Sequence, residues 1–263
     1  MRGRSPGADG FTLIEVIVVI AVISILAAMA VPYAVKILDQ SREEATKKQM
    51  EEIHRAIMGD PKVPTAGYLG DMGRLPVPPP VAALTNLNTQ GTQAGPTTGT
   101  LGVKYGWYGP YVKIGYSAGA YLVDGWGTPL VYNSPGAGQI TSYGPNRVVG
   151  GGDDITFPSY PSLTPIPSGR LQVNLYIWDN TNYVLNPSHL VAPTTVRQYY
   201  AVNGGRLLTT LGTPADPPYT FPPVHAGFHE VEAIIPPDLI TVRGRAVVYI
   251  PENNQAVLNL YLR

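Results

Sequence analysis

The stretch GFTLIEVIVVIAVISILAAMAV, residues 10–31, decides the fold of this chain. From Phe11 onward it is apolar except for Thr12, Glu15 and Ser24. As a helix these residues would span roughly 30 Å, which is the thickness of the hydrocarbon core of a bilayer. Arg2 and Arg4 precede the run, and basic residues next to a transmembrane segment tend to stay cytoplasmic. The sequence therefore predicts a single-pass membrane protein whose remaining residues lie outside the cytoplasm.

Three other interpretations compete for this segment. Ala28-Met29-Ala30 could end a secretory signal peptide, which would release a chain beginning at Val31. The run could also be a plain transmembrane anchor, or a buried helix of a soluble core, although its unbroken apolar length argues against a core helix. Glu15 discriminates among them, because a carboxylate within hydrocarbon needs a partner or a function.

The block Gly10-Phe11-Thr12-Leu13-Ile14-Glu15-Val16 resembles the processing site of type IV pilins and type II secretion pseudopilins. The resemblance implies that residues 1–10 are a leader, that prepilin peptidase cuts between Gly10 and Phe11, and that Phe11 is then N-methylated. It also implies that Glu15 is the assembly glutamate. Cleavage leaves an ammonium on Phe11, and a carboxylate one helical turn along can neutralise it within one chain or between subunits.

The helix is expected to continue to residue 58, giving a helix over 11–58 with a transmembrane part at 11–31. Its second half has good helix formers and acidic residues four positions before basic ones, as in Glu51 and Arg55. Ile53, Ala56 and Ile57 have the spacing of a face that packs on a globular head. Pro32 predicts a kink or a locally melted turn.

Composition limits the classes of function. The chain has 18 basic and 18 acidic residues, so no overall field attracts nucleic acid, and a nucleic-acid partner is not expected. It has no Cys, 29 Gly, 27 Pro and 17 Tyr, which is typical of a loop-rich β protein without disulfides. The expected fold class is α+β: the long helix, a small αβ head with antiparallel strands over 59–160, and a β-sandwich.

Two segments of the predicted head resemble pseudopilin heads. The run from Asp124 to Tyr132 resembles the D-P-W-G-x-P segment of those heads, with Gly125 in place of Pro. It predicts a tight turn that leads into a strand, with Trp126 in the core. The next segment, with residues 142–146 and 150–155, is similar to the calcium loop of the major pseudopilin of type II secretion. By that resemblance the side-chain ligands are Ser142, Asn146, Asp153 and Asp154.

Calcium prefers several oxygen ligands, which hydroxyl, amide and carboxylate groups between flexible glycines supply. Asn146 stands where the family commonly has Asp, so this loop has one negative charge fewer. The alternative is a solvated polar turn that binds no ion.

Patterns typical of enzymes do not hold up. Ser117 lies in a G-x-S-x-G sequence, but neither flank has the buried strand and helix that this motif requires. His225 and His229 lack the H-E-x-x-H order of a zinc helix and are expected on a surface strand or loop. The chain is predicted not to be an enzyme.

Prolines at short intervals over 161–168 predict an extended linker, and residues 169–263 predict an antiparallel β-sandwich with Greek-key connections. Arg170 to Trp178 alternates between apolar and polar residues, as a half-buried strand does. Asn203-Gly204-Gly205 predicts a hairpin turn. The region looks like the prealbumin-type sandwich of carboxypeptidase regulatory domains, which implies no catalysis.

The leading hypothesis is a structural filament subunit, a pseudopilin of a type II secretion-like system in the inner membrane, with its carboxyl-terminal domains periplasmic or extracellular. Its expected partners are prepilin peptidase, other pilin-like subunits in a helical filament, and an inner-membrane assembly platform. Calcium is the expected cofactor. The rival hypothesis is a minor type IV pilin that displays its sandwich for adhesion.

Overall fold

The structure is a computed structural model of the 263-residue chain. It describes residues 11–60, 65–77, 83–112, 119–133, 138–158, 168–178, 180–185, 194–212, 218–234, 242–252 and 254–262. The chain divides into two compact units, one ending at Ala45 and one beginning at Thr46.

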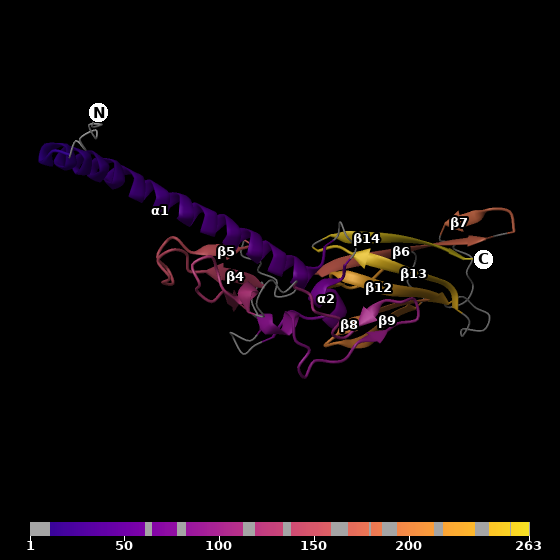
Figure 1. The fold of residues 1–263 in the computed structure, drawn as a ribbon. Helices are drawn as coiled ribbons and strands as arrows, with labels where there is room; N and C mark the ends of the chain where they lie inside the picture. Colours follow the sequence, from indigo (N-terminus) through magenta and orange to yellow (C-terminus); the bar gives the residue numbers. More distant parts are fainter. Residues whose placement is uncertain are drawn as a thin grey trace, which may run out of the picture. The chain divides into compact units, whose positions relative to one another are not determined.

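Helix α1, Leu13–Met58, is the longest element (Figure 1). It stays helical through Pro32, so the melted turn considered from the sequence is not present there. Gly59 ends the helix with a φ of +84°, a left-handed conformation that suits glycine, and its N–H still donates to the carbonyl of Arg55.

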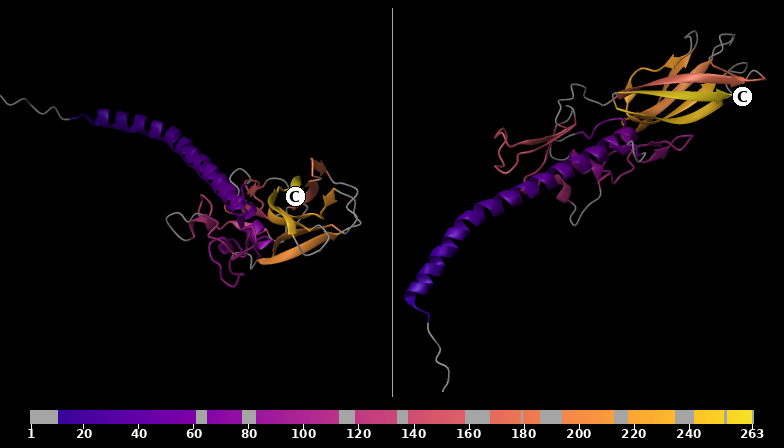
Figure 2. Two further views of the ribbon diagram at one scale, coloured as in Figure 1. Left: turned by 90° about the vertical axis from the view of Figure 1, so that its right-hand side faces the viewer. Right: turned by 90° about the horizontal axis from the view of Figure 1, so that it is seen from above.

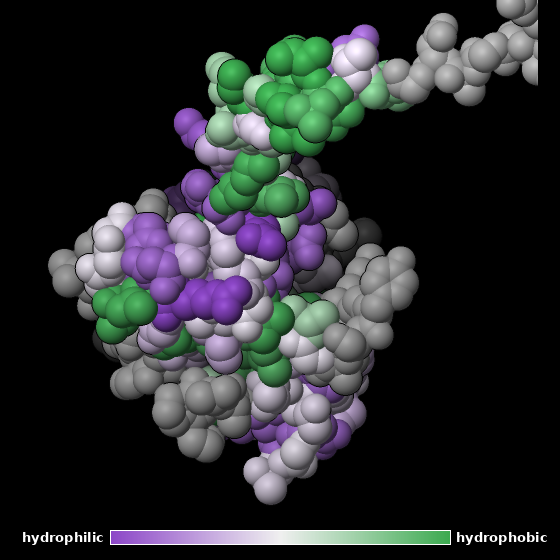
Figure 3. Space-filling view, turned by 60° about the vertical axis from the view of Figure 1, so that its left-hand side comes forward, coloured by the Kyte–Doolittle hydropathy of each residue, from purple (hydrophilic) through white to green (hydrophobic). Residues whose placement is uncertain are grey.

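The first half of α1 presents its apolar side chains outward. From Leu13 to Leu38 these large hydrophobic residues lie on the surface, as the green region of Figure 3 shows. Among the described residues, α1 is the one helix that is long and apolar enough to cross a membrane.

The last turns of α1 belong to the second unit and enter its core. Ile53, Ala56 and Ile57 are buried there, as their spacing predicted, together with Tyr68 and Leu69. The helices and strands around them are α2 (Gly67–Met72), two 3-10 turns (Leu84–Leu87 and Ala120–Leu122), β1 (Thr97–Thr98), β2 (Lys104–Tyr105), β3 (Val131–Asn133), β4 (Gln139–Ser142) and β5 (Ile155–Phe157). Strands β3, β4 and β5 form one antiparallel sheet and β1 and β2 another.

The remaining strands form two packed sheets (Figures 1 and 2). In the first sheet, β6 (Ser168–Trp178) pairs with β7 (Tyr183–Leu185), β10 (Tyr219–Thr220), β11 (Val224–His225) and β14 (Gln255–Leu262). The second has the order β13 (Val242–Ile250), β12 (Gly227–Ile234), β8 (Thr195–Val202) and β9 (Gly205–Gly212). Leu171, Val173 and Leu175 of β6 point between the sheets, because alternate residues of a strand face one side.

Helix α2 packs closely on the second sheet. A Cβ on Gly73 would lie 1.9 Å from the carbonyl oxygen of Ala201, and one on Gly70 would lie 3.4 Å from the Cα of Gly227. The N–H of Gly204, in the β8–β9 turn, donates to the carbonyl of Met72 at 2.8 Å. Short glycine contacts thus join the end of α2 to β8 and β12.

An ion pair between a buried carboxylate and a partly exposed arginine makes a second connection between these regions. Glu230 of β12 is buried and accepts a hydrogen bond from Arg206 at 2.8 Å and another from the N–H of Leu101 at 2.7 Å. The guanidinium of Arg206 lies 3.7 Å from the ring centre of Tyr199. With both hydrogen bonds and a ring contact, the buried carboxylate is compensated.

The expected α+β class is confirmed: a long apolar helix is followed by several antiparallel sheets. The hairpin is also confirmed, with Val202 paired to Gly205 and the two-residue turn Asn203-Gly204 at φ values of 51° and 79°. One pairing differs from a fully antiparallel sandwich, because β14 runs parallel to β6. Strand β13 ends where β6 begins, so a short connection places β14 beside β6 in the same direction.

The predicted linker lies outside the described residues except for Ser168. The division of residues 59–263 into a head and a separate sandwich stays a prediction.

The contact of α2 with β8 can be tested with a matched pair of glycine substitutions. Gly73→Ala should lower the free energy of unfolding by about 3 kcal/mol or more, because it adds a clash with a backbone carbonyl to the strain of a positive φ. Gly91→Ala has similar strain, at φ +54°, but meets no atom within 4 Å, and should cost about 1 kcal/mol. Chemical denaturation of both variants provides the measurement. Equal losses would show that the close approach at Gly73 is unimportant.

Candidate functional site

The amino-terminal site is built at the start of α1. Gly10 lies outside the described residues, and Phe11 is 89% exposed. Glu15 Oε2 accepts hydrogen bonds from the N–H of Thr12 at 2.9 Å and from its hydroxyl at 2.8 Å, while the N–H of Glu15 lies 3.4 Å from Thr12 Oγ1. Threonine followed three residues later by glutamate is a capping box, which satisfies the free N–H groups of a helix start.

This capping role of Glu15 was not predicted, although the Thr-x-x-Glu spacing is the sequence signal for it. Glu15 is therefore already hydrogen-bonded within its own chain. Any role of its charge in assembly has to be compatible with the cap.

The predicted calcium ligands fall into two groups. Asn146 and Asp153 come together: the N–H of Asn146 donates to Asp153 Oδ2 at 3.0 Å, and its side-chain amide donates to Asp153 Oδ1. Asp154 accepts from the N–H of Gly150 at 2.9 Å, and its other oxygen is buried without a hydrogen-bond partner among the described residues. A Cβ on Gly151 would lie 1.8 Å from the Asn146 amide, so a side chain at this position would displace that amide from Asp153.

Ser142 is directed elsewhere. It is fully buried, donates to Asp124 Oδ2 at 2.6 Å, and accepts from the N–H of Gly144 at 3.1 Å. The other oxygen of Asp124 accepts from the N–H groups of Trp126 and Thr128 at 3.0 and 2.8 Å. Asp124 thus forms the predicted tight turn and holds Ser142, and Trp126 is buried as expected.

The hydrogen bond between Ser142 and Asp124 was not predicted from the sequence, because it joins positions 18 residues apart. Within the described residues no three His, Cys, Asp or Glu side chains form a cluster suited to a metal ion. Any cation at this loop would therefore depend on Asp153, Asp154, amide oxygen and backbone carbonyls.

The two histidines correct an expectation. His225 and His229 lie in the core rather than on the surface. His225 Nε2 lies 2.7 Å from the carbonyl of Ala201, and His229 Nε2 lies 3.0 Å from the carbonyl of His225. Burial lowers the pKa of both side chains. The serine of the G-x-S-x-G sequence, Ser117, lies outside the described residues.

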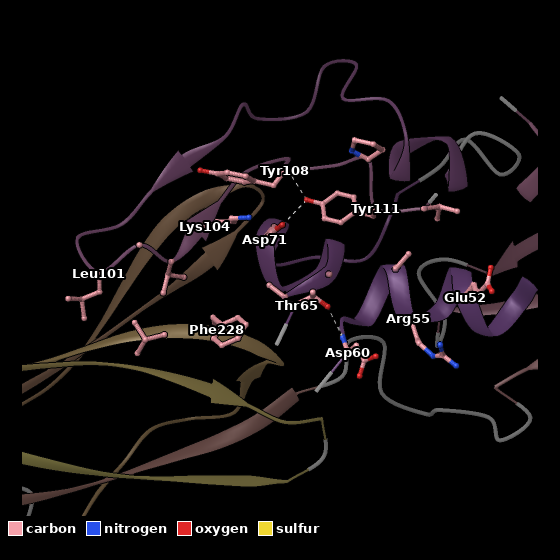
Figure 4. A pocket seen from close by; sticks show the side chains of 18 residues that line it. Glu52, Arg55, Asp60, Thr65, Asp71, Leu101, Lys104, Tyr108, Tyr111 and Phe228 are labelled. Carbon is pink, nitrogen blue, oxygen red and sulfur yellow. Dashed lines mark hydrogen bonds between the residues drawn. The ribbon is translucent and has the colours of Figure 1, made fainter. Parts of the chain in front are cut away.

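A cavity of about 770 Å³ opens between α2, the end of α1 and β12 (Figure 4). Asp71 lines it and accepts a hydrogen bond from the hydroxyl of Tyr111 at 3.0 Å, and that hydroxyl in turn accepts from the N–H of Tyr108 at 2.9 Å. Asp71 Oδ1 is buried without a hydrogen-bond partner among the described residues. Burial raises the pKa of Asp71 to about 6.

Comparisons with known proteins bear on the amino-terminal site. The family model for the prokaryotic N-terminal methylation motif matches residues 7–31. A search of curated proteins found no match. Among solved structures, a leucine-rich repeat protein from Bacteroides thetaiotaomicron VPI-5482 is similar over 54% of this chain and 18% of that chain, at 14% identity and a TM-score of 0.22. A TM-score this low does not indicate a shared fold.

The chain is thus a prepilin-like protein, since a long apolar helix begins with the N-terminal methylation motif of the type IV pilin and pseudopilin family. The motif implies processing by prepilin peptidase and pilin-like assembly. The helix is consistent with an inner-membrane-anchored prepilin. Proteins that carry this motif are generally structural rather than enzymatic.

The buried carboxylate of Asp71 predicts a pH-dependent stability. The pKa of Asp71 in the folded protein, about 6, lies above the usual aspartate value of 3.8. The cost of burying its charge is therefore absent below about pH 4, grows between about pH 4 and pH 6, and is fully present above that range. Asp71→Asn should therefore stabilise the protein by about 2 kcal/mol at pH 8 and give little gain at pH 4. Thermal unfolding at both pH values measures the difference.

Tyr111→Phe is the matched control, because it removes the hydroxyl that donates to Asp71. It should destabilise the protein more at pH 8 than at pH 4. A gain from Asp71→Asn that does not change with pH would contradict a buried charge at this position.

Proposed function

We propose that this protein is a structural filament subunit, a pseudopilin of a type II secretion-like system. The observation that carries the proposal is the uncovered apolar surface of α1 with the methylation motif at its start. In the membrane this surface lies in lipid. In a filament, helices of neighbouring subunits replace the lipid, and the apolar area stays out of water in both states.

Cleavage between Gly10 and Phe11 creates the charged group that pairs with Glu15 in the proposed assembly. It creates an amine on Phe11, four residues before Glu15, in an environment where an unpaired charge is costly. The Glu15 carboxylate has two oxygens, and the bonds from Thr12 use one of them. The remaining oxygen is available in this arrangement to pair with the amine of Phe11 or of an adjacent subunit.

Pairing between subunits also fixes their axial position. A subunit that slides along its neighbour separates the amine from the carboxylate and leaves both charges unpaired in an apolar environment. Buried polar pairs set the register of other helical assemblies in the same way.

The loop over residues 142–154 supports a calcium site as a second part of the proposal. Asp153, Asp154 and Asn146 supply oxygens from one short loop, and the unpartnered oxygen of Asp154 is suited to a hard cation. In this arrangement Ser142 positions the loop through Asp124 and Gly144 instead of binding the ion by its side chain.

The minor-pilin alternative shares the helix and differs in the destination of the subunit. Antibody labelling of the β6–β14 sheet on intact cells would favour a surface pilus. Accumulation of secreted proteins in the periplasm of a deletion strain would favour the secretion role and is the outcome we expect.

The role of Glu15 can be separated from helix capping with two substitutions. Glu15→Ala removes both the cap and the charge, whereas Glu15→Gln keeps an acceptor for Thr12 and removes only the charge. Both variants should be cleaved and methylated, and neither should form filaments. Mass spectrometry of the mature amino terminus and the yield of sheared filaments measure the two steps.

Normal filaments from Glu15→Gln, with none from Glu15→Ala, would assign the glutamate to capping alone. A mature chain beginning at Val31 would refute the processing site itself.

For calcium, millimolar CaCl₂ should raise the unfolding temperature of the intact chain, because an ion that binds only the folded state stabilises it. Asp154→Asn should abolish that rise with little effect in the presence of chelator, since it retains the side-chain shape. Differential scanning calorimetry with MgCl₂ as the control gives the comparison. An unchanged melting temperature in calcium would dismiss the site.

A further inference from the structure

The outer face of the sheet formed by β14, β6 and β7 has an unusual composition. Alternate residues of β6 point away from the core, and the parallel register pairs them with the outward residues of β14. A row of amides lies in the middle of this face and a group of aromatic rings lies at one end, and the exposed apolar side chains of Val257 and Leu185 lie beside them.

The amides form a connected row. Gln255 donates to Gln172 at 2.8 Å, Gln172 donates to Asn174 at 3.3 Å, and Asn174 donates to Asn259 at 3.0 Å. Each carboxamide has two N–H donors and an oxygen that accepts two hydrogen bonds. The bonds within the row therefore fix the orientation of the amides and use only part of their hydrogen-bonding capacity.

The aromatic rings continue the same face. The ring of Tyr176 stacks on that of Tyr261 with 4.7 Å between centres, and Tyr183 meets both Tyr261 and Trp178 edge-on at 5.3 and 5.1 Å. Tyr261 is 56% exposed, Tyr183 43% and Trp178 36%. Single exposed apolar residues are common on protein surfaces. A contiguous group of exposed aromatic rings is instead typical of a binding surface.

The face is almost free of charge. Among its described outward residues only Arg170 is ionic, and it lies at the end of β6 away from the rings. A polyanion such as nucleic acid needs several cations, which this face does not supply. A purely apolar protein surface would cover the amides and leave their polar groups unpaired.

We infer that this face binds a neutral polysaccharide. A sugar ring has a C–H face that packs on the electron-rich face of an aromatic ring, and a rim of hydroxyls that both donate and accept hydrogen bonds. The rings of Tyr261 and Trp178 suit the first, and the amide row beside them suits the second. An extended chain of sugars would lie along β6 and β14.

The site lies at the far end of the sandwich from α2. Strand β6 begins beside the contact with Ile250 and reaches Trp178 after ten residues, about 30 Å at the rise of a strand. Binding there involves none of the residues assigned to processing, assembly or calcium. The inference therefore goes beyond the proposed filament role and does not depend on it.

Affinity electrophoresis of the intact chain in detergent tests the inference, with gels that contain hydroxyethylcellulose, xylan or galactomannan. At least one of these polymers should retard the protein. Tyr261→Ala and Trp178→Ala should each weaken binding about tenfold or more, because each removes a stacking ring. Leu208→Ala, an exposed apolar residue of β9 in the other sheet, is the matched control and should bind normally.

A second readout guards against misfolded variants. The polymer that retards the protein should protect its tryptophan fluorescence from acrylamide, and Trp178→Phe should remove this protection while keeping an aromatic ring. Retardation by anionic polygalacturonate alone, or by none of the polymers, would overturn the inference. Self-association that Tyr261→Ala abolishes, without polysaccharide binding, would instead assign the face to a second copy of the chain.

Discussion

Between Leu13 and Leu38, α1 exposes an apolar surface that no other described residue covers, and this surface constrains the rest of the molecule. Water is an unfavourable solvent for it, so the helix has to be in lipid or against other helices. The one carboxylate near its start is tolerated because Thr12 donates to it twice. Glu15, which caps the start of the helix, is thus also the carboxylate that marks the amino-terminal end of this surface.

In the second unit, the end of α1 packs with α2, and α2 packs on the sheets. Ile53 and Ile57 enter a core that also holds α2, and α2 contacts β8 and β12 through glycines that leave no room for a side chain. The pair of Glu230 with Arg206 adds a buried electrostatic contact to the same region. The loop near Asp153 and the β6–β14 sheet therefore belong to one compact unit.

Local patterns carried most of the information that could be predicted from the sequence. The apolar run gave the helix, the Ile53 spacing gave its buried face, and Asn203-Gly204 gave the hairpin, since each depends on neighbours in the chain. The parallel pairing of β14 with β6 and the bond from Ser142 to Asp124 join distant residues, and no local pattern specifies them. The burial of His225 and His229 was mispredicted for the same reason. The capping box of Thr12 and Glu15 is also a local pattern and could have been predicted from its spacing. It was not, because a carboxylate in an apolar run was interpreted only as a charge that needs a partner.

The pairing of β14 with β6 also affects when the protein acquires its shape. The first strand of this sheet waits for the last described strand, some 80 residues later, before it gains its longest partner. A chain whose amino end stays cytoplasmic and whose later residues are exported in chain order exports β6 well before β14. Until translocation finishes, the hydrogen-bonding edge of β6 stays open to other chains, so export and folding of this sheet are coupled in time.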